Sequence, residues 1–142
     1  MNNIQWLDAM SVGIKEFDDD HKAFFTTLFD LDDALIADEV EKALQLAIAL
    51  RDLVKDHGAR EAEFLRQNGF PQLQQILDAH SLALERTEKL LSLVKMDPQT
   101  AARTIFEMQN NLMTYLMDGD LNYRYFIKEI QGNRDSGAPV RS

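Results

Sequence analysis

Apolar residues recur at spacings of three and four along most of this chain, in four successive segments separated by short breaks that contain Asp, Gly or Pro. Such spacing places the apolar side chains of each segment on one face of an α-helix. Four amphipathic helices joined by short loops predict an all-α, up-and-down four-helix bundle. The expected segments run from Asp18 to about Ala37, from about Glu39 to Gln67, from Pro71 to just before Asp97, and from Pro98 to the break at Asp118-Gly119-Asp120. Asp18 or Asp19 is placed to cap the first helix, and Pro71 suits the first turn of the third.

Further segments flank the predicted bundle on both sides. Before it, a run of apolar residues predicts an N-terminal apolar arm that packs as a lid against one end of the bundle: Ile4, Trp6, Met10, Val12 and Ile14. After it, Leu121 to Ile130 predicts a short C-terminal helix, either separate or a continuation of the fourth helix past a kink at Gly119. The remaining Gly, Ser, Pro and polar residues have no periodicity and predict a flexible tail. We therefore expect a single domain over residues 1–131 and a tail over 132–142.

Composition limits the partners of the chain. Its formal charge of -9, from 24 acidic and 15 basic residues, argues against a nucleic-acid or anionic-membrane surface, because both need basic patches. The chain has no cysteine, so a transition metal would need nitrogen and oxygen ligands. We find neither a secretion signal nor the ~20 apolar residues of a membrane span, and we expect a soluble, cytoplasmic protein.

The histidines indicate a metal site. There are three, and each lies on the predicted inner face of a different helix: His21, His57 and His80. One such histidine alone is more often a hydrogen-bonded core residue than a ligand, but three on converging faces favour ligation. His57 and Glu61 stand one turn apart on the same face, where a buried carboxylate needs a partner. Mixed imidazole and carboxylate ligands in a helical bundle indicate iron or manganese, with zinc as an alternative.

Several motifs, in order along the chain, resemble those of the bacterial hemerythrins, from about Trp6 to Ile130. Trp6 and Ser11-Val12-Gly13-Ile14 are similar to the family's entry segment, and Phe17-Asp18-Asp19-Asp20-His21-Lys22 to its I-D-x-x-H-K motif. His57 to Glu61 resembles H-F-x-x-E-E, with Gly58 and Ala62 as departures, and Asn68-Gly69-Phe70-Pro71 is similar to the G-Y-P turn. His80 lies where the second histidine of H-x-x-x-H would fall. Asp120-Leu121-Asn122-Tyr123 with Phe126 is similar to the family's closing D-x-x-Y-x-x-F.

The resemblance implies a centre of two non-haem iron ions, oxo- or hydroxo-bridged, which Glu61 and Asp120 bridge with their carboxylates. His21 and His57 would bind one iron, and His80 the other. Asp118 is the alternative to Asp120 for the bridging role, because the irregularity at Gly119 can turn either residue inward.

Two positions depart from the family's ligand set. Ile76 and Tyr115 stand where the second iron would have its other two histidines. Isoleucine cannot coordinate a metal, whereas Tyr115 would either bind ferric iron as a phenolate or pack with its hydroxyl hydrogen-bonded. The expected centre is therefore more open than that of an oxygen carrier.

The resemblance favours a protein that binds O2 or a related small ligand for oxygen transport, storage, delivery or sensing. An oxidase or peroxidase that uses the opened site with a peroxide ligand is the alternative from the enzyme class. The third hypothesis is an interaction module that keeps the bundle with a mononuclear or lost metal site.

Overall fold

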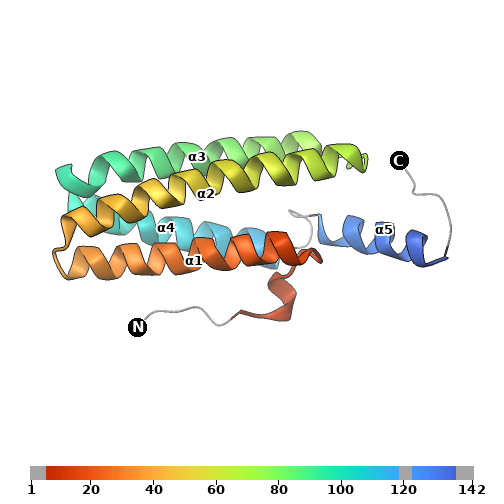
Figure 1. Cartoon of the computed structure of the whole chain (residues 1–142), viewed down its shortest axis with the longest axis horizontal. Coiled ribbons are helices and arrows are strands. Elements are labelled where there is room, and N and C mark those ends of the chain that lie inside the picture. The colour runs from red at the N-terminus through yellow and green to blue at the C-terminus, as the bar shows by residue number, and fades with distance from the viewer. Residues whose placement is uncertain (1–5, 119–122, 137–142) are drawn as a thin grey trace.

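The computed structural model describes residues 6–118 and 123–136, and every regular element in these ranges is helical. The elements are the short 3-10 helix η1 (Asp8–Met10) and the α-helices α1 (Lys15–Ile36), α2 (Val40–Gln67), α3 (Leu73–Met96), α4 (Pro98–Met117) and α5 (Arg124–Ser136). Helices α1 to α4 lie lengthwise beside one another in alternating directions, and α5 extends past one end of them (Figure 1). Contacts join α1 to α2, α2 to α3, α3 to α4 and α4 back to α1, so the four helices close into a bundle. The predicted fold class is confirmed.

Most of the predicted helix ends agree with the structure. The first helix ends at Ile36 and the second at Gln67, and Pro98 opens α4, which Asp97 caps by accepting a hydrogen bond from the Thr100 N–H at 3.2 Å. Pro is tolerated at this position because the first helical N–H has no partner within the helix. The short loops therefore follow from local sequence signals.

Two predicted helix starts are wrong. Helix α1 begins at Lys15, and Asp18 lies inside its first turns rather than at its N-cap. The Asp18 carboxylate instead accepts hydrogen bonds from the Ser11 hydroxyl and, at 2.9 Å, from the Val12 N–H, and so fixes the turn before the helix. Helix α3 begins at Leu73, two residues after Pro71, so this proline precedes the first turn.

The N-terminal arm packs against the end of the bundle, as predicted. Met10 and Val12 are buried in one apolar cluster with Ile127 and Ile130 of α5. Gly13 has a φ of 91°, and a Cβ added there would lie 3.0 Å from the Ile127 side chain, so glycine allows the close approach of arm and helix. Ile4, the first residue of the predicted arm, lies outside the described residues.

The predicted C-terminal helix is present and is separate from α4. Residues 119–122, which include Gly119 and the start of the expected helix at Leu121, lie outside the described residues. Helix α5 continues to Ser136, past the expected domain boundary at residue 131. The helix therefore includes residues that the sequence assigned to the tail, while the division into a domain and a tail stays a prediction.

The core has two apolar clusters with polar residues between them. The cluster at the arm end contains Leu65 of α2 and Ile76 of α3, and the cluster at the far end contains Leu50 and Leu90 of the same helices. Between these positions, α2 and α3 carry His57, Glu61 and His80. No helix in the described ranges combines the length and apolar character needed to cross a membrane.

Candidate metal centre

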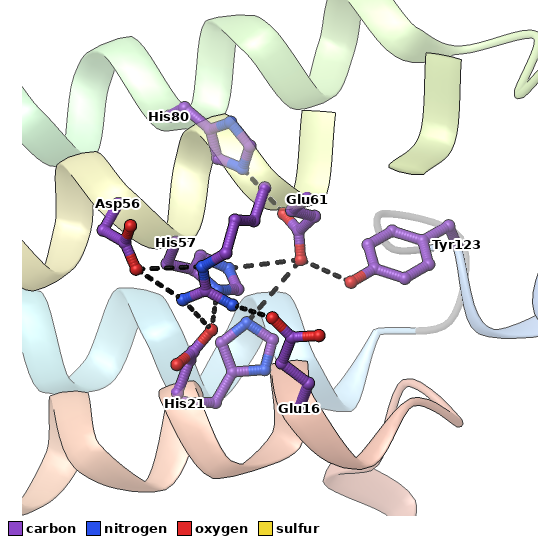
Figure 2. A network of polar contacts seen from close by, with 9 residues as sticks. Glu16, His21, Asp56, His57, Glu61, His80 and Tyr123 are labelled. Atoms are coloured by element: carbon purple, nitrogen blue, oxygen red, sulfur yellow. Dashed lines mark hydrogen bonds and ion pairs between the residues drawn. The ribbon is translucent and has the colours of Figure 1, made fainter. Parts of the chain in front are cut away.

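Buried polar side chains from three helices meet in the layer between the two apolar clusters. His21 comes from α1, His57 and Glu61 from α2, and His80 from α3, so the structure brings together four of the six residues predicted as ligands (Figure 2). Three of them, His21, His57 and Glu61, are at most 4% exposed, and each offers one ligand atom within 4.8 Å of the others. No other such group of His, Cys, Asp and Glu occurs among the described residues.

Glu61 lies at the centre of this arrangement. His80 Nε2 donates to Oε1 at 2.6 Å, His57 Nε2 lies 3.2 Å from Oε2, and the Tyr123 hydroxyl also donates to Oε2. Burial by itself would raise the pKa of Glu61, but the hydrogen bonds from His57 and His80 outweigh it and hold this pKa far below its usual range. Glu61 is therefore a buried anion held by three donors.

His57 is held between two carboxylates. Its Nδ1 lies 2.8 Å from Asp20 Oδ2, while its Nε2 faces Glu61. Burial lowers the pKa of His57, but the hydrogen bonds with Glu61 and Asp20 raise it above its ordinary value. A carboxylate on one ring nitrogen fixes the tautomer and orientation of an imidazole, which is how proteins commonly prepare a histidine ligand. The geometry thus directs Nε2 toward the site.

Arg60 holds Asp20 in this position. Its guanidinium donates to Asp20 at 2.8 Å and to Asp56 at 2.9 Å, and it also contacts Glu16 of α1. Asp20 keeps only 14% of its side chain exposed. The ion pairs therefore join α1 to α2 behind His57, on the side away from Glu61.

His21 has a buried nitrogen that finds no hydrogen-bond partner within residues 6–118 and 123–136. Its Nδ1 makes no hydrogen bond to any described residue, and its Nε2 lies 3.9 Å from Glu61 Oε2. Burial lowers the pKa of His21 to about 4, so the ring is neutral at pH 7. Buried polar atoms nearly always have a partner, so a buried imidazole with an unpartnered nitrogen is a candidate metal ligand. Metal–nitrogen bonds of about 2 Å place the ligands of one ion about 3 to 4 Å apart, close to the separations seen here.

His80 approaches the site because Gly58 has no side chain. A Cβ at Gly58 would lie 3.3 Å from the Nδ1 and 3.4 Å from the Cγ of the His80 ring. Glycine is unfavourable in a helix interior, so a close contact of this kind is a physical reason for its presence. Gly58, a departure from the motif that the sequence resembles, thus leaves room for the His80 ring.

Of the other two predicted ligands, the structure describes Tyr115 but not Asp120. Tyr115 borders the cavity beside the site, and burial together with the charge of Glu61 raises its pKa far above the usual range. The hydroxyl is therefore protonated in the metal-free protein, and a phenolate would need a cation beside it. Asp120 lies outside the described residues. Asp118, its alternative, is the exposed C-cap of α4. Ile76 is 1% exposed and belongs to the arm-end apolar cluster.

Sequence reasoning missed three residues that support the site. Tyr123 was recognised within a family motif but was not expected to bind Glu61, 62 positions away. Asp20 and Arg60 were not assigned to the site, because the run Asp18-Asp19-Asp20 has the composition of a helix cap and solvated face. The one sequence feature that could have assigned Asp20 to the site is its place next to His21. This feature does not identify His57 as the partner of Asp20.

A cavity of about 380 Å³ adjoins the site and is lined by all four long helices. His21, His57, Glu61, His80 and Tyr115 contribute to its wall, and the rest of the lining is mainly apolar. The candidate ligands are therefore accessible to a small molecule from inside the bundle.

Comparison with known proteins agrees with this arrangement. No curated protein matches the chain in sequence. The family model of the hemerythrin HHE cation binding domain matches residues 12–119, which is well over half of the chain and includes His21, His57, Glu61 and His80. The helical bundle and its buried group of histidine and carboxylate donors agree with a cation-binding domain. The chain belongs to the hemerythrin HHE cation-binding domain family.

Proposed function

We propose that this protein holds non-haem iron with His21, His57 and Glu61 and binds O2 or a related small ligand there. The observation that supports the proposal is the convergence of two buried imidazoles on one buried carboxylate, with a nitrogen of His21 unpartnered among the described residues. Nitrogen and oxygen donors of this kind suit iron. Bound iron would supply redox and Lewis-acid chemistry toward small oxygen ligands.

We further propose a second iron, oxo- or hydroxo-bridged to the first. Its protein ligands would be His80, Asp120 and Tyr115, with Glu61 and Asp120 as carboxylate bridges. Within this centre the protein's own groups have separate tasks: Glu61 supplies the negative charge, Asp20 holds the proton on His57 Nδ1, and Tyr123 holds a proton toward Glu61 Oε2.

Metal content tests the assignment. Protein purified from iron-rich medium should contain iron, and His57→Ala and Glu61→Gln should each lose most of it, because both ligands come from one turn of α2. Glu63→Gln is the matched control, because Glu63 is exposed on the same helix and pairs with Arg66 instead. Two metals per chain would support the dinuclear centre and one a mononuclear site. Equal metal content in all the variants would refute the ligand assignment.

An oxidase or peroxidase is the second candidate function, and Ile76 favours it. The side chain is buried among apolar residues, so this position gives the second iron no donor. A steady-state peroxidase assay on iron-loaded protein, with Glu61→Gln as control, separates turnover from reversible ligand binding. Protein that takes up no metal would instead support the interaction module. A cytoplasmic location and the lack of a nucleic-acid partner stay predictions.

Tyr115 can be tested by the visible spectrum of the air-oxidised protein. If Tyr115 binds iron as a phenolate, a charge-transfer band should be present and should disappear in Tyr115→Phe, which keeps the ring and its packing. Ile76→His would place two imidazoles one turn apart with His80 and should tighten binding of the second iron. An identical spectrum in Tyr115→Phe would assign Tyr115 to packing.

A further inference from the structure

The cavity beside the candidate metal centre is much larger than a diatomic ligand needs. Its volume of about 380 Å³ equals roughly a dozen water molecules at about 30 Å³ each. Protein interiors contain few voids larger than one water, whereas cavities of about 300 Å³ or more are typical of sites for organic ligands. The cavity therefore has room for an occupant larger than O2, besides any metal held by the candidate ligands in its lining.

The walls select an apolar occupant. Phe24 and Leu28 of α1, Leu50 and Val54 of α2 and Met108 and Leu112 of α4 line the cavity. Of the lining residues, Leu82 on α3 and Asn111 and Thr114 on α4 are exposed, so the cavity opens to the surface between α3 and α4. A molecule with an apolar body can enter by this opening and displace poorly held water from the walls.

One charged side chain in the lining has no polar partner within the described part of the chain. Arg86 of α3 is half-buried and makes no ion pair or hydrogen bond with any residue that the structure describes, although the chain has 24 acidic residues. A guanidinium presents paired donors that match a carboxylate. The Glu61 carboxylate, which is buried in the same lining, disfavours a second negative charge near it. The charges thus place an anionic group at Arg86 and the apolar body toward His80.

The helical rise between these two residues gives a scale for the length of the occupant. Arg86 follows His80 by six positions on one helix, which is about 9 Å along the axis at about 1.5 Å per residue. Since an extended alkyl chain with carbon–carbon bonds of about 1.5 Å advances about 1.3 Å per bond, a chain of about eight carbons covers this distance. We propose that the cavity binds a medium-chain monocarboxylic acid, with the carboxylate on Arg86 and the alkyl chain directed to His80. The lining also contains the candidate metal ligands, so the acid would share the cavity with any metal bound there, but its binding needs no metal and is tested separately from the proposed function.

Calorimetric titration of the chelator-treated protein with octanoate tests the proposal. Octanoate should bind with a dissociation constant below about 1 mM, and 1-octanol, which lacks the charge, should bind at least about tenfold more weakly. Arg86→Gln should weaken octanoate binding by about tenfold or more. Arg103→Gln, an exposed arginine of α4 outside the cavity lining, is the matched control and should leave binding unchanged.

A second variant shows where the ligand binds. Ala83 lines the cavity, and Ala83→Phe should fill it and abolish octanoate binding, while circular dichroism reports whether the bundle remains folded. If Ala83→Phe disturbs the fold, Ala83→Leu replaces it as the test, because this smaller change should still reduce octanoate binding. Absence of binding at about 5 mM octanoate, equal binding to Arg86→Gln and the parent, or full binding to both folded Ala83 variants would each overturn the proposal.

Discussion

Tyr123→Phe removes a single hydroxyl from the interior and tests how the buried charge of Glu61 is stabilised. Tyr123 and Glu61 are each 1% exposed, and the hydroxyl donates to Glu61 Oε2. Burial and the neighbouring Glu61 carboxylate raise the pKa of Tyr123 far above its usual range, so the phenol keeps its proton and remains a donor. Phenylalanine retains the ring, whose centroid lies 6.1 Å from that of Phe70, and so leaves the packing nearly unchanged.

The expected cost follows from the number of donors on Glu61. A hydrogen bond to a charged group contributes about 1.5 to 3 kcal/mol to stability. Glu61 keeps His57 and His80 as partners in the variant, so the loss should lie toward the middle of this range, at about 2 kcal/mol. With a urea m-value of about 2 kcal/mol/M for a domain of this size, the midpoint should fall by about 1 M.

Urea unfolding of the chelator-treated protein, followed by far-UV circular dichroism, measures this change. Tyr125→Phe is the matched control because it makes the same substitution on α5, where Tyr125 is 62% exposed. Its free energy of unfolding should stay within about 0.5 kcal/mol of the parent. Equal midpoints for Tyr123→Phe and Tyr125→Phe would show that the hydroxyl does not stabilise Glu61. A more stable Tyr123→Phe would mean that burying the phenol costs more than its hydrogen bond returns.

Three further predictions concern the orientation of His57, its proton and the N-terminal arm. Asp20→Asn should weaken metal binding by about 10- to 100-fold, because Asp20 fixes the ring of His57. The control Asp19→Asn removes only an exposed ion pair with Lys15 and should leave the metal affinity unchanged. Equal affinities of the two variants in metal titrations would contradict this role of Asp20. Metal affinity should also fall with acidification by up to about tenfold per pH unit, because Glu61 and Asp20 raise the pKa of His57 and a metal must displace its proton. If the metal affinity does not change between pH 8 and pH 6, His57 is not a ligand. Gly13→Ala should destabilise the fold by about 1 to 3 kcal/mol, because the φ of Gly13 is 91° and Ile127 leaves no room for a Cβ. Gly132→Ala, in open space on α5, should instead stabilise the fold by up to about 1 kcal/mol. Thermal unfolding should therefore show melting temperatures that shift in opposite directions for the two variants.

The helices and their inward faces could be predicted from the sequence alone. The recurrence of apolar residues every three or four positions is a local property, because the helical period fixes which side chains share a face. The stops near Ile36, Gln67 and Met96 followed from local breaks and from Pro98. The placement of His57 and Glu61 on one buried face followed in the same way, since they are four positions apart on one helix. Their role as ligands remains a prediction.

Only the tertiary structure decided which side chains meet across helices. Asp20 and His57 are 37 positions apart, and Tyr123 and Glu61 are 62 apart. Local periodicity orients each residue toward the core but does not specify the axial shift or rotation of one helix against another, which depend on the packing of whole faces. The start of α1 at Lys15 has a similar cause, because Asp18 binds the turn at Ser11 and Val12 instead of capping the helix. The sequence thus determined what each helix presents to the interior, and packing between helices determined the partner of each buried charge.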